Sequence, residues 1–304
     1  MIDACTNRYR ADINLADVND AHSFAIACVQ GGSTVLDIGV ADGSVARLLK
    51  KMGCRVWGVD IDEEVSTLAR EHCEEVIVGD ADQLDLGSLV SCKFDVILLL
   101  DVLEHLKDPL SFLVRASELL TDSGYFVMSV PNVAHVAMRA QLLSGRFPYT
   151  DVGILDRTHL RFFDPVTAKE FISDAGLVIL DESRVRFPVD GTEIDVDKGS
   201  VAPSLLDQIL DDPEAETYQF LFMAAPRGSV LESDPPFLPA REIQRELQRC
   251  KRDPMLRDRR FGNGTYDEVM AQLLSIQSAN RSRRGALNAL LEVLRETTDN
   301  LYPP

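Results

Sequence analysis

The chain has 304 residues, enough for one large domain and an appendage. Its hydrophobic (45%) and charged (26%) fractions are typical of a soluble globular protein, and no uncharged apolar run reaches the roughly 18 residues that a membrane span requires. The first 227 residues carry 19 Lys and Arg against 38 Asp and Glu, a net charge of −19, and the remainder carries +1, which gives −18 for the chain. An acidic body of this kind repels phosphate backbones, so nucleic acid is an unlikely partner.

The N-terminal segment and the cysteines indicate the compartment. Residues 1–20 are polar and lack the apolar stretch of a secretory signal. The six cysteines are scattered and form no C-x-x-C pair. They predict reduced thiols, not a disulfide or zinc framework, and therefore a cytoplasmic protein.

A strand, a tight turn and a helix are predicted in succession from residue 34 onward. The apolar run 34–38 predicts a buried strand, small residues follow, and an amphipathic helix begins at Ser44. At such a turn, backbone N–H groups and the helix dipole can meet a nucleotide-like ligand. A second strand, 55–60, ends at Asp60, where a carboxylate can hold the hydroxyls of a ribose.

The spacing of small residues in this turn distinguishes between classes of nucleotide. Gly39, Ala41 and Gly43 stand at i, i+2 and i+4, whereas a dinucleotide fingerprint has glycines at i, i+2 and i+5. A dehydrogenase is therefore disfavoured. With Asp37 before it, the loop resembles the D-x-G-x-G-x-G motif of class I S-adenosylmethionine-dependent methyltransferases, Ala41 replacing the middle glycine.

Three further segments resemble the same family in the expected order. They are the short strand and acid at 76–81, the apolar strand at 94–100 followed by Asp-Val-Leu-Glu-His-Leu-Lys-Asp-Pro at 101–109, and the stretch 119–132, similar to the family's helix, turn and fifth strand. The resemblance covers about residues 20–227. It implies an α/β fold: a Rossmann-like, seven-stranded, mostly parallel sheet with helices on both faces.

The rest of the predicted sheet follows the family pattern. A helix is expected at 165–175, a sixth strand from Gly176, a short helix at 203–210 and a seventh, antiparallel strand at 218–225. The resemblance also implies S-adenosylmethionine as cofactor, with Asp80 at the adenine amino group. The implied cofactor-binding residues are Asp37, Gly39, Ala41, Gly43, Asp60, Ile61, Asp80, Ala81, Asp101 and Val102.

The acceptor is expected at the carboxyl ends of the strands, beside the cofactor. Candidate residues there are Asp101, Glu104, His105, Asn132, His135 and His159. His159 lies in Asp-Arg-Thr-His-Leu-Arg-Phe-Phe (156–163), which resembles an element of bacterial methyltransferases of sugar and cell-surface glycan pathways. It follows the segment 141–154, in which we expect a loop that covers the acceptor. We expect His159 to be the general base, because imidazole titrates near neutrality, with His105 as a second catalytic residue. A structural role, in which His159 braces this loop, is the alternative.

A metal site is a second hypothesis for the same region. Asp101, Glu104 and His105 stand at i, i+3 and i+4, which on a helical turn places them on one side. Quinone-type O-methyltransferases and terminal 2′-O-methyltransferases of small RNAs look similar here and use two acids and a histidine to hold a divalent ion, for which His159 would be a fourth ligand. The same Glu-His-Leu also occurs in metal-free members, so a metal is not favoured.

These observations predict three parts: an N-terminal helical or irregular segment (1–20), a methyltransferase domain (21–227), and a linker with a helical extension (228–304). Helices at 241–251 and 266–297 would support a homodimer or partner docking. The expected reaction is O-methylation of a sugar, glycan-linked or small-metabolite hydroxyl. The alternatives are a phenolic, quinone or secondary-metabolite O- or N-methyltransferase and, from another class, a non-catalytic cofactor-binding or scaffold subunit.

Overall fold

The computed structural model describes residues 17–85, 87, 92–197 and 201–236, together with residues 13, 238, 241, 244 and 245. The helix expected at 266–297 lies outside the described residues, as does most of the one expected at 241–251. The chain forms two compact units. The first comprises Met1–Gly79, Lys93–Leu98 and Ser233–Pro304, and the second comprises Asp80–Cys92 and Leu99–Glu232.

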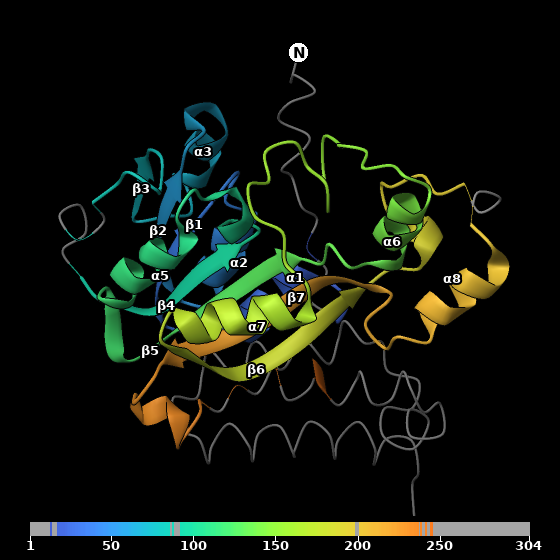
Figure 1. Ribbon diagram of the computed structural model, residues 1–304. Coiled ribbons are helices and arrows are strands. Elements are labelled where there is room, and N and C mark those ends of the chain that lie inside the picture. Colours follow the sequence, from blue (N-terminus) through green and yellow to red (C-terminus); the bar gives the residue numbers. More distant parts are fainter. Residues whose placement is uncertain are drawn as a thin grey trace, which may run out of the picture. The chain divides into compact units, whose positions relative to one another are not determined.

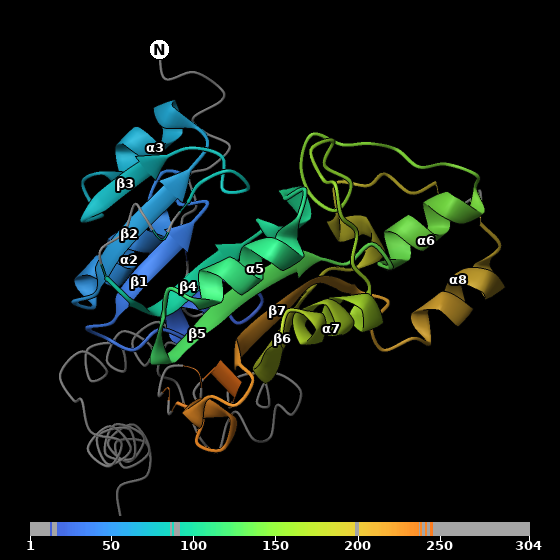
Figure 2. The same ribbon diagram turned by 60° about the vertical axis from the view of Figure 1, so that its left-hand side comes forward.

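The first unit alternates helices and parallel strands (Figures 1 and 2). Its elements are α1 (Ala21–Ala27), β1 (Thr34–Ile38), α2 (Ser44–Lys51), β2 (Arg55–Asp60), α3 (Glu63–Ala69), β3 (Glu75–Val78) and most of β4 (Phe94–Leu100). Strand β2 pairs in parallel with β1 on one side and with β3 on the other. Helices α2 and α3 pack against β2, as the predicted strand–turn–helix order requires.

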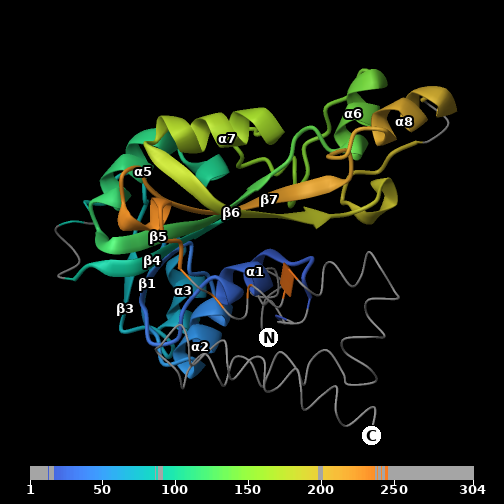
Figure 3. The same ribbon diagram turned by 90° about the horizontal axis from the view of Figure 1, so that it is seen from below.

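The second unit contains the remaining strands, and Figure 3 shows α7 lying along β6 and β7. Its elements are the 3₁₀ turn η1 (Leu103–His105), α5 (Pro109–Ser117), β5 (Leu120–Pro131), α6 (Val136–Leu143), α7 (Pro165–Asp174), β6 (Leu177–Arg186), η2 (Val189–Gly191), α8 (Pro203–Leu210), β7 (Thr217–Pro226) and η3 (Val230–Glu232). Strand β7 runs antiparallel to both β5 and β6, which confirms the expectation for the seventh strand.

The seven strands are hydrogen-bonded in the order β3-β2-β1-β4-β5-β7-β6. This order, with β7 antiparallel, confirms the Rossmann-like, mostly parallel sheet expected from the sequence. Central strand β4 is buried along Val96–Leu99, which explains its uninterrupted apolar sequence. Among the described residues, no helix is both long and apolar enough to cross a bilayer.

Two local expectations differ from the structure. Strand β5 begins at Leu120, so the turn expected before Gly124 is part of the strand, because sheet pairing overrides the local glycine signal. The linker expected at 229–239 contains the short 3₁₀ turn η3. The bounds of β1, β2, β4 and α8, and the start of α2, agree with the sequence-based expectation to the residue.

Candidate functional site

The small-residue loop between β1 and α2 needs an unusual backbone. Gly39, Ala41 and Gly43 all have positive φ angles, of 79°, 47° and 77°. A Cβ on Gly43 would lie 2.7 Å from the Cα of Ala69, so only glycine fits against α3. Ala41 is an L-residue in the left-handed region, which costs about 1–2 kcal/mol. The loop therefore stores strain at the position where the family motif has a glycine.

A glycine outside any recognised motif also shapes this loop. A Cβ on Gly58, in the middle of β2, would lie 2.8 Å from Cγ1 of Val40. Val40 is itself 4% exposed, so the loop packs directly on the backbone of β2. Sequence analysis missed Gly58, although a glycine inside a strand is a recognised sign of a close backbone approach.

The backbone N–H groups of the loop are already bonded within the first unit. Those of Gly39 and Val40 donate to the carbonyl of Val59, that of Gly43 to Val40, that of Ser44 to Asp42, and that of Ala41 to Asp60. Each of these five N–H groups therefore already has an acceptor within the unit. A diphosphate needs free donors at such a loop, so the structure independently disfavours a dinucleotide.

Acidic side chains, in contrast, remain capable of accepting hydrogen bonds here. Asp60 accepts from the Ala41 N–H at 2.8 Å and from the Asp62 N–H at 2.9 Å, one on each carboxylate oxygen. Each oxygen keeps a further lone pair for a ribose hydroxyl. The neighbouring Ile61 side chain is 71% exposed, an apolar surface beside this carboxylate.

Asp37 differs from Asp60 because it is buried at the end of β1. Its side chain is only 4% exposed, and this burial raises its pKa to about 7, opposed by nearby His22 and assisted by the negative charge of Asp60. A carboxyl group in this state can become an anion when a cation arrives. The loop thus suits a positively charged nucleoside better than a polyanionic one.

The remaining cofactor candidates lie in the second unit. Asp80 accepts from the Asp82 N–H at 3.0 Å and from Gln83 Nε2 at 2.7 Å, and Ala81 lies in the same turn. Asp82 in turn accepts from the N–H of Lys107 at 2.9 Å. The turn after β3 and the segment after η1 are therefore bonded to each other within this unit.

Asp101 is held in a strained conformation at the end of β4. Its φ is 54°, and its N–H donates to Ser129 Oγ at 2.9 Å. One of its carboxylate oxygens accepts from the same hydroxyl at 2.9 Å and from Gln219 Nε2. Val102, which follows, is half-buried. Ser129 and Gln219 come from β5 and β7, and no local sequence signal identifies them as partners of Asp101.

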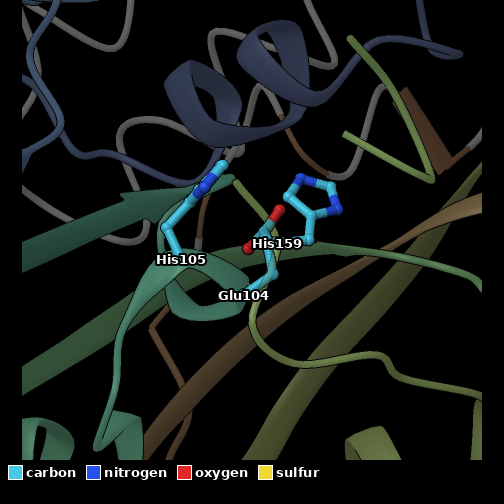
Figure 4. Close-up of side chains that lie close together, drawn as sticks. All are labelled: Glu104, His105 and His159. Carbon is cyan, nitrogen blue, oxygen red and sulfur yellow. The ribbon is translucent and has the colours of Figure 1, made fainter. Parts of the chain in front are cut away.

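This strain changes the geometry expected for the metal candidates. Because Asp101 is not in a right-handed helical conformation and η1 begins only at Leu103, the three residues do not share one helical face. The structure instead brings together Glu104, His105 and His159, one ligand atom of each lying within 4.8 Å of the others (Figure 4). Asp101 lies outside this group.

Backbone hydrogen bonds join the two motifs that supply this cluster. The N–H groups of Leu160 and Arg161 donate to the carbonyl of Glu104 at 2.7 and 3.1 Å. The element at 156–163 is therefore bonded to the turn that carries Glu104 and His105. The two imidazole rings meet edge to face, with centroids 4.7 Å apart.

The partners of His105 define its tautomer. The Thr158 hydroxyl donates its hydrogen to the Asp156 carboxylate at 2.7 Å, so it can only accept from His105 Nδ1, 3.0 Å away. The carbonyl of Thr158, 3.4 Å from the same nitrogen, also requires a donor. The neutral His105 ring therefore carries its hydrogen on Nδ1 and a lone pair on Nε2.

His159 is held in the same tautomer. Its Nδ1 lies 3.0 Å from the carbonyl of Ile154, which can only accept. Burial and the neighbouring His105 lower the pKa of His159, so that the ring is neutral at physiological pH. Its Nε2 lone pair is therefore available to accept a proton or bind a metal.

Glu104 completes the cluster. It is fully buried, and neither carboxylate oxygen has a hydrogen-bond partner among the described residues. Desolvation, followed by the charge of Asp101, raises its pKa well above the usual range. In the Nδ1–H tautomer, the Nε2 atoms of His105 and His159 carry no hydrogen. Together with the Glu104 carboxyl group, when it is ionised, they form a cluster that contains only hydrogen-bond acceptors. Such a set requires a proton on Glu104 or a bound cation.

Asn132 and His135, two further candidates, are bonded into the scaffold of the second unit. Asn132 Nδ2 donates to the carbonyl of Thr217 at 2.7 Å, and Asn132 Oδ1 accepts from a backbone N–H. His135 is buried, with Nε2 2.9 Å from the carbonyl of Phe187 and Nδ1 accepting the N–H of Ala137 at the start of α6. Neither side chain has a free polar atom for an acceptor.

Comparisons with known proteins support the resemblance of the N-terminal part of the chain to methyltransferases. Residues 10–182 match the family model described as a methyltransferase domain. A ubiquinone biosynthesis O-methyltransferase of Coxiella burnetii (strain Dugway 5J108-111) is 22% identical over 170 residues, 55% of this chain and 73% of that protein. One from Actinobacillus pleuropneumoniae serotype 7 (strain AP76) is 35% identical over 109 residues, 33% of this chain and 47% of that protein. The fold is shared with a SAM-dependent methyltransferase from Archaeoglobus fulgidus, at a TM-score of 0.50 and 20% identity over 72% of this chain and 97% of that one.

Proposed function

This chain belongs to the methyltransferase-domain family and uses S-adenosylmethionine, and from that premise we propose that it methylates a hydroxyl oxygen of a sugar, of a glycan-linked acceptor or of another small metabolite. The observation that carries the proposal is the tautomer of His159. Its Nδ1 hydrogen is held by the Ile154 carbonyl, and its Nε2 lone pair is free on a ring that burial keeps neutral. This is the state that a general base requires.

We propose that the cofactor binds at the carboxyl ends of β1, β2 and β3, where acidic side chains lie. Asp60 accepts the ribose hydroxyls through its remaining lone pairs, and Asp80 contacts the adenine amino group. Asp37 supplies negative charge for the cationic ligand. The absence of free N–H donors among the five bonded loop residues supports a ligand without phosphates. The other proposed contacts are Gly39, Ala41 and Gly43, which give the loop its shape, and Ile61, Ala81, Asp101 and Val102.

The bound cofactor supplies an electrophilic methyl group, so the protein must orient the acceptor and remove its proton. His159 Nε2 takes the hydroxyl proton as the oxygen attacks, a contribution of about 10²–10⁴ in rate for a general base. His105, in edge-to-face contact with His159, is oriented by the Thr158 hydroxyl at its Nδ1 and lowers the pKa of His159. We propose that His105 acts beside His159 in this way.

A screen of acceptors tests the proposal. S-adenosylhomocysteine release is measured with sugars, nucleotide sugars, phenols and amines, and the best acceptor is used to compare wild type with His159→Ala. We expect the variant to lose at least 10² in kcat while it still binds the cofactor. Turnover within about threefold of wild type would leave His159 only the structural role of bracing the loop. Cofactor binding without turnover on any acceptor would favour the non-catalytic alternative.

A phenolic or quinone-type acceptor with a divalent ion is the second candidate. Two observations favour it. The curated relatives are named ubiquinone biosynthesis O-methyltransferases. Glu104, His105 and His159 also converge, and the side-chain atoms that face one another have no hydrogen to donate when Glu104 is ionised. These residues would hold Mg, Mn or Fe, which would polarise a hydroxyl. Loss of activity in EDTA, with recovery on adding one of these ions, would select this candidate. Activity unchanged by EDTA would exclude it.

A further inference from the structure

Glu193 connects two segments of the second unit that no recognised motif links. One of its carboxylate oxygens accepts from the backbone N–H of Ile154 at 2.7 Å, and the other accepts from the hydroxyl of Tyr218 at 2.9 Å. The residue belongs to the segment 188–216, which carries no motif. Each oxygen therefore has its own partner, in a geometry that fixes the carboxylate.

Ile154 is the residue that orients His159. While its N–H is held by Glu193, its carbonyl accepts the Nδ1 hydrogen of His159 at 3.0 Å. Ile154 is fully buried in an apolar cluster with Ile194, the residue after Glu193. The segment that carries Glu193 is thus docked on Ile154 by both its backbone bond and its side-chain packing.

Gly153 shows how closely the two segments approach. Its φ is 84°, and a Cβ at this position would lie 2.2 Å from the carboxylate of Glu193. Any side chain there would displace the carboxylate from the Ile154 N–H. The close contact therefore depends on a glycine at position 153.

Tyr218 anchors the other end of this connection. It lies near the start of β7, next to the residues of this strand that pair with β5 and β6, and its carbonyl accepts the N–H of Asn132 at 2.8 Å. Burial and the charge of Glu193 raise the pKa of Tyr218, so its hydroxyl stays protonated and donates. The Ile154 backbone is thereby connected through Glu193 to the start of β7.

We propose that Glu193 is a positioning residue for the methyl-transfer reaction. It fixes the Ile154 backbone against β7, so that the Ile154 carbonyl holds His159 as its Nδ1–H tautomer with Nε2 directed at the acceptor. The inference rests on the proposed role of His159 as general base. It differs from a purely structural role because it predicts the position of one hydrogen on one imidazole ring.

Nitrogen NMR of histidine-labelled protein bound to S-adenosylhomocysteine tests this directly and needs no acceptor. In wild type at pH 8 we expect His159 as the Nδ1–H tautomer. In Glu193→Ala the Nε2–H tautomer becomes populated. Glu193→Gln should preserve the wild-type signal, because the amide oxygen still accepts from Ile154 and the amide nitrogen can donate to Tyr218. Glu170→Ala, at an exposed position on α7, is the matched control and should change nothing.

A second variant covers the case in which Glu193→Ala fails to fold. Gly153→Ala displaces the carboxylate without removing it and should shift the His159 tautomer in the same direction. Once an acceptor substrate has been identified, Glu193→Ala and Gly153→Ala should each lower kcat by about 10- to 10²-fold and leave the affinity for the cofactor unchanged.

The failures of the two proposals are distinguishable. If His159→Ala impairs turnover but His159 stays in the Nδ1–H tautomer in Glu193→Ala and in Gly153→Ala, the proposed role of Glu193 is refuted. The assignment of His159 as general base then still stands. If His159→Ala retains turnover, the assignment of His159 as general base fails, whatever the NMR signal shows.

Discussion

The pKa of Asp37 leads to a quantitative prediction for cofactor binding. Its value of about 7 means that the carboxyl is mostly protonated at pH 6 and mostly ionised at pH 8. If only the anion pairs with the cationic cofactor, the apparent Kd scales with the inverse of the ionised fraction. The cofactor should then bind about tenfold more weakly at pH 6 than at pH 8, and binding at pH 6 should release about 0.9 proton.

Calorimetric titration of S-adenosylmethionine at pH 6, 7 and 8, in two buffers of different ionisation enthalpy, measures both quantities. Asp37→Asn should bind the cofactor weakly at every pH, and its Kd should no longer change with pH. This result would separate the Asp37 carboxyl from His22 and Asp60, the titratable groups that perturb its pKa. The Kd of S-adenosylhomocysteine, whose sulfur is neutral, should change less with pH. A Kd that is constant from pH 6 to 8, or an Asp37→Asn variant with the wild-type slope, would refute the reasoning.

The same group sets the sign of a stability effect in the ligand-free protein. Because the folded-state pKa of Asp37 is raised from 3.8 to about 7, the folded state holds more protons than the unfolded state between these values. Stability should therefore fall as the pH rises from about 4 to 7, by at most about 4 kcal/mol, and the loss should be complete above pH 7. Urea unfolding of wild type and Asp37→Asn across this range should show the difference.

Three further predictions concern the loop and the buried carboxyl. Gly58→Ala should lower the free energy of unfolding by about 1–3 kcal/mol because its Cβ meets Val40, and the double variant with Val40→Ala should recover most of the loss; additive effects in urea unfolding would contradict this contact. Ala41→Gly should unfold within about 1 kcal/mol of wild type, since relieved strain offsets the added chain entropy, and a larger loss would show that the Cβ of Ala41 is needed. Glu104→Gln should stabilise the protein by about 1–3 kcal/mol at pH 8 in EDTA, because the raised pKa of the buried carboxyl makes folding costly above its usual titration range, whereas an amide does not titrate; an unchanged urea midpoint would mean that the carboxyl is paired.

The sequence predicts the fold well because its signals are local and agree with one another. Apolar runs give β1, β2 and β4 with their observed bounds, and the small-residue loop marks the turn before α2. The resemblance to a known family supplies what local pattern cannot, namely the antiparallel seventh strand. The start of β5 was misplaced because its glycine reads locally as a turn, whereas pairing keeps the chain extended.

The site is less predictable because it depends on contacts between distant residues. His105 and His159 were identified as a pair of candidates by their motifs, and the structure places their rings together. That Asp101 lies outside this cluster follows from a positive φ, which the letter Asp does not reveal. Glu193 is 39 residues from its partner Ile154, and nothing in either local sequence indicates the bond.

Binding of the cofactor ribose by Asp60 can be measured in a structure of the protein with bound S-adenosylhomocysteine, as the distances from the two ribose hydroxyls to the carboxylate of Asp60. We expect both hydroxyl oxygens within hydrogen-bonding distance, about 2.5–3.0 Å, with the loop N–H groups of Gly39, Val40 and Gly43 still bonded to the backbone. A nucleoside bound elsewhere, or a ribose held by these N–H groups with Asp60 unengaged, would contradict this expectation.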